Sequence, residues 1–123
     1  MNDNKSVIIE FIKAWSRLDA NELSNYFHED GTYHNIPIDP VTGRKNIEDF
    51  IKAFTKTWKE TNWEILYIVS ADNIVITERL DRTIATNGRT LELPCVGIFE
   101  MENSKIKIWR DYFDLGTYLK VFE

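Results

Sequence analysis

The sequence has few of the residues that stabilise small proteins by covalent or metal cross-links. Its 123 residues include one cysteine and two histidines. A single thiol cannot form an internal disulfide, and one cysteine with two scattered histidines cannot supply the four ligands of a usual zinc site. We therefore expect a fold that depends on its hydrophobic core, with neither a disulfide nor a metal centre.

Long runs of one kind of residue are also missing. No stretch of Lys and Arg marks a phosphate-binding stripe, and 20 acidic against 15 basic side chains give a formal net charge of −5. We therefore expect no nucleic-acid partner. Charged residues interrupt the apolar stretches, which argues against a membrane partner, and residues 1–15 lack the basic and apolar regions of a signal peptide. These features predict a cytoplasmic protein.

What the chain does contain is apolar and aromatic material in regular patterns. Hydrophobic residues make up 43% of the sequence and aromatic residues 13%, while 28% of the residues are charged. This composition is too apolar for a disordered chain, and the length is that of one domain. No linker, repeat or low-complexity segment divides the chain. We therefore expect a single domain spanning residues 1–123.

The first half of the chain has the apolar spacing of helices. Apolar residues recur three and four positions apart in three segments, which places them on one face of a helix. Asp19 can cap the second of these helices. The segment 28–44 contains Gly and Pro breaks and is predicted to be an extended piece and a loop. The predicted helices lie near residues 5–18, 20–27 and 45–58.

From Trp63 onward the pattern changes to that of strands. The segments are rich in β-branched and aromatic residues, and the sequences Ala-Asp-Asn, Thr-Asn-Gly and Glu-Asn-Ser separate them at hairpin spacing. Helices followed by strands favour an α+β fold, in which a curved, mostly antiparallel sheet wraps around the three helices as a cone. The apolar mouth of such a cone is a usual site for a small molecule. The predicted strands are 63–70, 74–83, 89–101 and 105–113.

Two of these strands carry charged residues on a face that should point inward. Because side chains alternate along a strand, Arg79 and Asp81 share one face, and Asp111 shares a face with Trp109 and Phe113. A carboxylate on an aromatic face is costly unless it is paired, and Arg79 is a candidate partner. Taken alone, the pattern fits a structural ion pair better than a functional site.

A second polar pair lies in the extended segment. Tyr33 and Asn35 are two residues apart and share a face, and a phenol and an amide placed in this way can both hold a water molecule. The alternation turns His34 away from them. In isolation, a core tyrosine and a loop-capping asparagine are the better interpretation.

Four segments taken together resemble those of the limonene-1,2-epoxide hydrolase family, and they come in the family's order. They span residues 33–115, about two-thirds of the chain. The last segment is long enough to be specific to the family, whereas Tyr-x-Asn or Arg-x-Asp alone would be weak evidence for it. The segments are YHNIP at 33–37, TERLD at 77–81, GIFE at 97–100 and WRDYFDL at 109–115.

The resemblance implies a fold and a reaction. The family has the nuclear transport factor 2-like cone fold, is usually dimeric, and hydrolyses small apolar epoxides to vicinal diols without a cofactor or metal. Compared residue by residue, Asp111 looks like the general base, Asp81 like the general acid and Arg79 like the bridge between them. Tyr33 and Asn35 resemble the residues that hold the attacking water. We also expect a homodimer formed through the outer face of the sheet.

The lining of the pocket and the activity itself have alternatives. The same cone fold hosts polyketide cyclases and ketosteroid-isomerase-like enzymes, which need one inward carboxylate as base, and non-catalytic binding modules. Epoxide hydrolysis needs both Asp81 and Asp111. Thr83 and Cys95 are smaller or more polar than a purely apolar lining, which leaves the substrate's identity open. The predicted wall residues, each also compatible with plain core, are Trp63, Leu93, Cys95, Ile98, Trp109 and Phe113.

Overall fold

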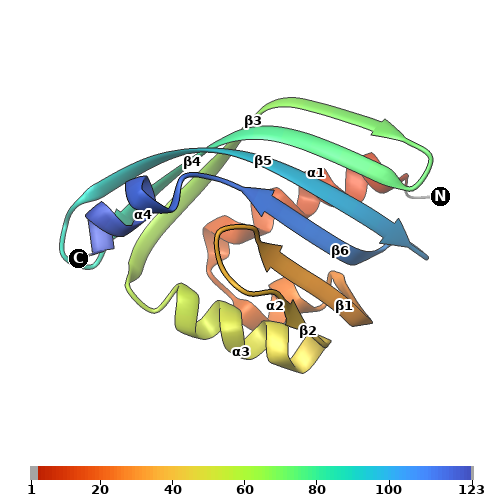
Figure 1. The fold of residues 1–123 in the computed structure, drawn as a ribbon, viewed down its shortest axis with the longest axis horizontal. Coiled ribbons are helices and arrows are strands. Elements are labelled where there is room, and N and C mark those ends of the chain that lie inside the picture. The colour runs from red at the N-terminus through yellow and green to blue at the C-terminus, as the bar shows by residue number, and fades with distance from the viewer. Residues whose placement is uncertain (1–2, 123) are drawn as a thin grey trace.

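A strongly curved sheet makes up most of the fold (Figure 1). The structure, a computed structural model, describes residues 3–122. Six strands in this range form one sheet. Their bounds are β1 (Phe27–Asn35), β2 (Val41–Thr42), β3 (Trp58–Ala71), β4 (Ile74–Ala85), β5 (Thr90–Glu102) and β6 (Lys105–Tyr112).

The strand order is β2-β1-β6-β5-β4-β3. Strands β3 to β6 form the antiparallel meander that the hairpin spacing predicted. At the other edge, β1 runs parallel to β6 and antiparallel to the short β2. The prediction of an α+β fold with a curved, mostly antiparallel sheet is therefore confirmed.

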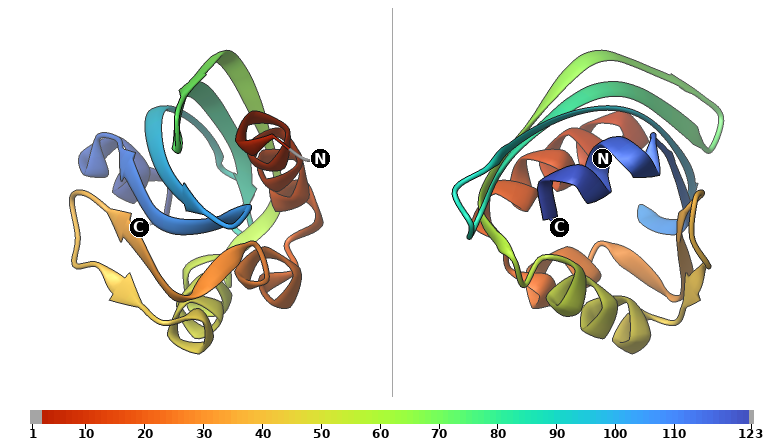
Figure 2. Two further views of the ribbon diagram at one scale, coloured as in Figure 1. Left: turned by 90° about the vertical axis from the view of Figure 1, so that its right-hand side faces the viewer. Right: turned by 60° about the vertical axis from the view of Figure 1, so that its left-hand side comes forward.

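The helices lie on the concave side of the sheet (Figure 2). In the part of the chain that the structure describes, no helix is long and apolar enough to cross a membrane. A 3₁₀ turn at Trp15–Arg17 follows the first helix. The helices are α1 (Asn4–Ala14), α2 (Ala20–Ser24), α3 (Arg44–Phe54) and α4 (Leu115–Phe122).

All three predicted helices end earlier than predicted, and α1 stops at Ala14, where the 3₁₀ turn follows. Helix α3 stops at Phe54, and Trp58 begins β3 instead of continuing the apolar face of the helix. Both the Thr55 N–H and the Thr55 hydroxyl donate to the Ile51 carbonyl, at 2.9 and 2.7 Å, and the β-branched Thr55 and Thr57 lower the helix propensity of the next turn. Helix α2 likewise stops before Phe27, which begins β1 and which the helical pattern had included.

Helix α4 was not predicted. It begins after Asp114, whose carboxylate accepts hydrogen bonds from the Thr117 backbone N–H at 2.9 Å and from the Thr117 hydroxyl at 2.7 Å. An aspartate before an apolar segment is a helix-start signal that the sequence does carry.

The core between helices and sheet is largely aromatic. Trp15 stacks on Trp63 with ring centroids 4.3 Å apart, and Tyr33 stacks on Trp109 at the same distance. Phe11 of α1 meets Trp109 edge-on at 5.1 Å. Each fully buried aromatic side chain stabilises the fold by about 2–3 kcal/mol relative to exposure. This packing holds the inner face of the sheet rigid where the polar residues lie.

Candidate active site

The inner face of the sheet brings the predicted polar residues into one cluster. Strand alternation points Arg79, Asp81 and Asp111 inward from β4 and β6. Pairing of neighbouring strands places Asn35, Asp111 and Gly97 side by side in one row across β1, β6 and β5.

Arg79 joins the two carboxylates. Its Nε and Nη2 donate to the two oxygens of Asp81 at 3.1 and 2.9 Å, and its Nη1 and Nη2 donate to those of Asp111 at 2.9 and 2.8 Å. Nη1 also faces Thr77 Oγ1 at 3.5 Å, so each of the five guanidinium N–H groups has an acceptor. The side chains of Arg79, Asp81 and Asp111 are 0%, 6% and 5% exposed. The structure therefore brings together the three residues that alternation placed on inward faces.

The charge of this cluster favours a bound proton. One guanidinium cannot neutralise two carboxylates, and a buried net charge costs several kcal/mol. Burial raises the pKa of Asp111, against a smaller opposing effect of Arg79. Burial lowers the pKa of Arg79, but the charges of Asp111 and Asp81 raise it by more. The pKa of Arg79 therefore lies well above its ordinary value. One proton held by Asp111 beside the permanent cation balances the charge of the cluster.

Aromatic rings hold the guanidinium in place. Arg79 Cζ lies 4.6 Å from the centre of the Trp63 ring and 5.8 Å from that of Trp109. A cation over a desolvated indole face gains about 2 kcal/mol. Because Trp63 is itself stacked on Trp15, the guanidinium has a fixed position between the carboxylates.

Gly97 leaves the space that the guanidinium occupies. A Cβ atom at this position would lie 2.7 Å from Arg79 Nη1 and 3.0 Å from Asp111 Oδ1. Any side chain there would push the Arg79–Asp111 pair apart, which explains why a glycine stands on the inward face of β5.

We therefore expect a Gly97→Ala variant to lose at least about 10-fold in kcat with a smaller change in KM, since small displacements of positioned groups are costly. Steady-state kinetics on a substrate of the wild-type protein would measure this. Gly31→Ala is the matched control, because its Cβ would lie 3.0 Å from two backbone carbonyls far from the cluster. Equal losses of kcat in both variants would show that Gly97 acts through stability alone.

Tyr33 and Asn35 lie beside the Asp111 carboxylate. The Ile36 N–H donates to the Asp111 carbonyl at 2.9 Å, which ties the end of β1 to β6 at this point. The Asn35 side chain lies within hydrogen-bonding reach of the Tyr33 hydroxyl, and both side chains line the cavity that Asp111 also lines. Burial and the charge of Asp111 raise the pKa of Tyr33 well above its ordinary value, so the phenol keeps its proton. Both groups can therefore bind a water molecule next to Asp111.

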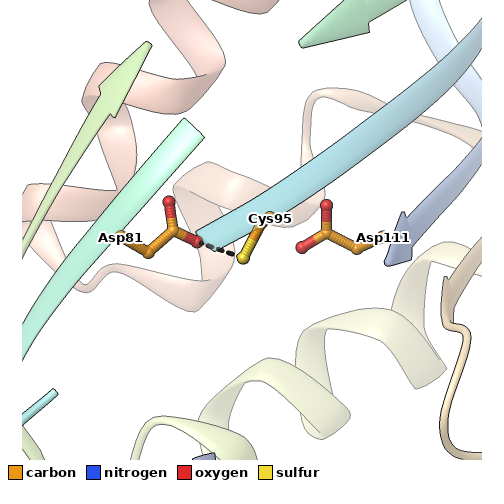
Figure 3. Close-up of side chains that lie close together, drawn as sticks. All are labelled: Asp81, Cys95 and Asp111. Carbon is orange, nitrogen blue, oxygen red and sulfur yellow. Dashed lines mark hydrogen bonds between the residues drawn. The ribbon is translucent and has the colours of Figure 1, made fainter. Parts of the chain in front are cut away.

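The Cys95 side chain also lies close to the carboxyls of Asp81 and Asp111 (Figure 3). Its thiol donates to Asp81 Oδ2 at 3.4 Å, and burial raises the pKa of the thiol, which stays protonated. Possible ligand atoms of Asp81, Cys95 and Asp111 lie within 4.8 Å of one another. The donor set nevertheless fits Arg79 better than a metal ion, because the guanidinium already binds all four carboxylate oxygens.

A partly open cavity lies against the cluster, and the atom-free space in it, including the part open to solvent, is about 330 Å³. Four of the predicted wall residues, Trp63, Leu93, Cys95 and Phe113, do line it. The full lining is Tyr33, Asn35, Phe54, Trp58, Trp63, Asp81, Thr83, Leu91, Leu93, Cys95, Asp111, Phe113 and Tyr118.

Two predicted wall residues do not line the cavity. Ile98 is on the outer face of β5, because the inward residues of this strand are Leu93, Cys95 and Phe99, and alternation turns Ile98 the other way. Trp109 is fully buried behind the ring of Tyr33 and supports the site from the core.

Other lining residues were missed. Leu91 has the same alternation as Leu93 and could have been found from it. Trp58 was assigned to a helix, and Phe54 and Tyr118 come from the ends of α3 and α4, whose placement over the sheet depends on tertiary packing.

Similar structures define the fold class. A putative SnoaL-like polyketide cyclase from Shewanella putrefaciens is 16% identical, with a TM-score of 0.84 over 99% of this chain and 97% of that chain. An LEH-like epoxide hydrolase from Mycobacterium tuberculosis is 22% identical, with a TM-score of 0.81 over 95% of this chain and 86% of that chain. The chain thus has the nuclear transport factor 2-like α+β fold, which cyclases and hydrolases share.

The family is narrower than the fold. The sequence model of the limonene-1,2-epoxide hydrolase catalytic domain matches residues 2–123. Epoxide hydrolase EphG from M. tuberculosis is 26% identical over 112 residues, which cover 89% of this chain and 72% of that protein. The chain belongs to the limonene-1,2-epoxide hydrolase family, as its four motifs predicted.

Proposed function

We propose that the protein is an epoxide hydrolase that adds water to a small, largely apolar epoxide in one step and releases a vicinal diol. The observation that carries the proposal is the pair of buried carboxyls on one guanidinium. Opening an epoxide needs a base that takes a proton from water and an acid that gives one to the ring oxygen. A neutral Asp–Arg–Asp cluster with one shared proton supplies both.

Asp111 is the proposed base because the groups that can hold water lie beside it. Tyr33 and Asn35 face the same cavity from the neighbouring strand, with Asn35 directly paired to Asp111. Burial raises the pKa of Asp111, so this carboxylate is a stronger base once its proton has passed to Asp81 within the cluster. The water attacks a ring carbon while Asp111 takes its proton.

Asp81 is the proposed acid. It lies across the guanidinium from Asp111 and also lines the cavity, so its proton can reach the oxygen of an epoxide bound between them. The Cys95 thiol at Asp81 Oδ2 helps to orient this carboxyl. As the C–O bond breaks, the proton moves from Asp81 to the departing oxygen. A proton returned from Asp111 through the Arg79-linked cluster and water restores the starting state.

The experiment that tests this function is direct. Purified protein is incubated with a panel of cyclic and aliphatic epoxides, and diols are identified by mass spectrometry. We expect one or more epoxides to be converted, and Asp111→Asn protein serves as the blank. Absence of diol from every epoxide would contradict the hydrolase proposal.

We also propose that the protein forms a homodimer through the convex face of the sheet, opposite the cavity. Monomeric proteins rarely expose large contiguous apolar patches, and a stable interface buries on the order of 1,600 Å² in total. Light scattering at micromolar concentration should give the dimer mass, and a monomer mass would contradict the proposal. The apolar residues of this face, each at least 37% exposed in the single chain, are Tyr67, Val69, Ile76, Val96 and Tyr112.

A further inference from the structure

The cavity has a second polar end, away from the catalytic cluster. Thr83 lines the cavity one inward position beyond Asp81 on β4, in the row formed with Thr61 and Leu91. Two residues along a strand correspond to about 7 Å. The Thr83 side chain is therefore too far from Arg79 to belong to the catalytic cluster, and the proposed reaction does not use it.

The hydroxyl of Thr83 has hydrogen-bonding capacity to spare. It lies 2.7 Å from Thr61 Oγ1, which also accepts from Trp63 Nε1 at 2.9 Å and lies 3.1 Å from the Arg82 carbonyl. A hydroxyl offers one donor and two acceptor positions, and Thr61 engages one of those of Thr83. Among residues 3–122 the Thr83 hydroxyl has no further partner, so two of its positions remain for a ligand.

Tyr118 adds a donor at the same end. The Trp58 indole N–H donates to the Tyr118 hydroxyl at 3.0 Å, and Trp58 is paired with Ala85, two residues beyond Thr83 on β4. Burial raises the pKa of Tyr118 to about 12, so its proton is retained. In the described part of the chain this O–H has no acceptor, although the residue lines the cavity.

Between the two polar ends the wall is apolar. Trp63, Leu91, Leu93 and Phe113 contribute to it. A buried hydroxyl or phenol that stays unpaired when a ligand displaces water loses the hydrogen bonds that water made and gains none in return. A purely hydrocarbon epoxide that filled this cavity would impose that loss at Thr83 and Tyr118.

We propose that the substrate is an epoxide that also carries a hydroxyl group, separated from the ring oxygen by about 7 Å of hydrocarbon. The hydroxyl donates to Thr83 Oγ1 and accepts from the Tyr118 O–H, while the ring oxygen lies at Asp81. The inference rests on the proposed hydrolase function and defines its substrate class as hydroxylated epoxides.

The test compares hexene oxide with its ω-hydroxy derivative, which differs only by the hydroxyl. We expect wild-type kcat/KM to favour the ω-hydroxy epoxide by about 5- to 10-fold, the value of one hydrogen bond. Thr83→Val should remove or reverse this preference, because the hydroxyl then faces a methyl group, and Tyr118→Phe should reduce it. A loss of folded protein lowers kcat/KM for both epoxides equally, so it cancels in the ratio of the two values. Thr90→Val at the exposed first residue of β5 is the matched control and should keep the wild-type ratio.

A wild-type ratio at or below one, or an unchanged ratio in Thr83→Val, would overturn the inference while leaving the hydrolase proposal intact. If neither epoxide is hydrolysed, the hydroxyl site is tested by binding alone. Calorimetry then measures the affinity for the stable diol and triol that the two epoxides would give on hydrolysis. Tighter binding of the triol, lost in Thr83→Val, would support the hydroxyl site although the hydrolase proposal had failed. Equal binding of the diol and the triol would overturn the hydroxyl site as well.

Discussion

An Asp111→Asn variant is expected to lose about 10²- to 10⁴-fold in kcat/KM for any epoxide that the wild type hydrolyses, because an amide cannot take the proton from water. Asp81→Asn should lose a similar factor, since the amide does not release a proton to the ring oxygen. The double variant should be little worse than either single variant, because the two carboxyls act as one unit. Steady-state kinetics over a range of pH would measure all three.

The same Asp111→Asn protein tests the electrostatic part of the account. Burial raises the pKa of Asp111 above 3.8, so wild-type stability from this group is complete at low pH and is lost as the pH rises through the raised value. The introduced asparagine amide does not ionise, so the variant does not lose this stability as the pH rises. Its melting temperature should therefore improve relative to wild type as the pH is raised from about 4 to about 7. A difference that does not change with pH would contradict the buried-charge argument.

The outcome for Asp81 also separates the competing activities. An isomerase or cyclase on this fold needs only one carboxylate as base. If Asp81→Asn keeps wild-type hydrolysis while Asp111→Asn abolishes it, the role of Asp81 as acid is wrong, and the single-base activities become the better interpretation.

Replacing Arg79 by Met is expected to lower the free energy of unfolding by about 3–5 kcal/mol, because two buried carboxyls would lose their shared partner. Urea unfolding followed by tryptophan fluorescence would measure the loss near neutral pH. The loss should be smaller at low pH, where both carboxyls are protonated. The stability effect distinguishes Arg79 from the two aspartates, whose substitution leaves the guanidinium with one carboxylate.

Arg82 provides the matched control for this experiment. It is three residues away on the same strand, faces the opposite side, and pairs with Glu64 and Glu92 at the surface. Exposed ion pairs add little to stability, so Arg82→Met should unfold close to wild type. Equal losses in the Arg79 and Arg82 variants would show that burial of the Asp–Arg–Asp cluster has no special role.

Alternation along single strands was the part of the site that the sequence could predict. It correctly placed Arg79, Asp81 and Asp111 on inward faces, because the period of two is a local property of the backbone. The same rule, applied to β5 from Leu93 and Cys95, would have excluded Ile98 from the cavity. That error came from treating any apolar strand residue as a possible wall.

The relations between distant segments could not be read in the same way. Parallel pairing of β1 with β6 brings Asn35 to Asp111, and no local pattern specifies that contact. The end of α3 was missed because the apolar spacing continues to Trp58, although the chain turns at Thr55. Tyr118 reaches the cavity only because α4 packs back over the sheet, so the hydroxyl-binding end of the cavity depends on tertiary structure.

The measurement that tests the central claim most directly is one turnover in water enriched in heavy oxygen, with protein in excess over epoxide. If Asp111 activates water without bonding to the substrate, the diol of the first turnover contains one heavy oxygen and the protein contains none. A carboxylate that attacked the ring itself would give a first-turnover diol with ordinary oxygen and would retain the label after its ester was hydrolysed. Label in Asp111 or Asp81, located by mass spectrometry of peptides, would contradict direct attack by water.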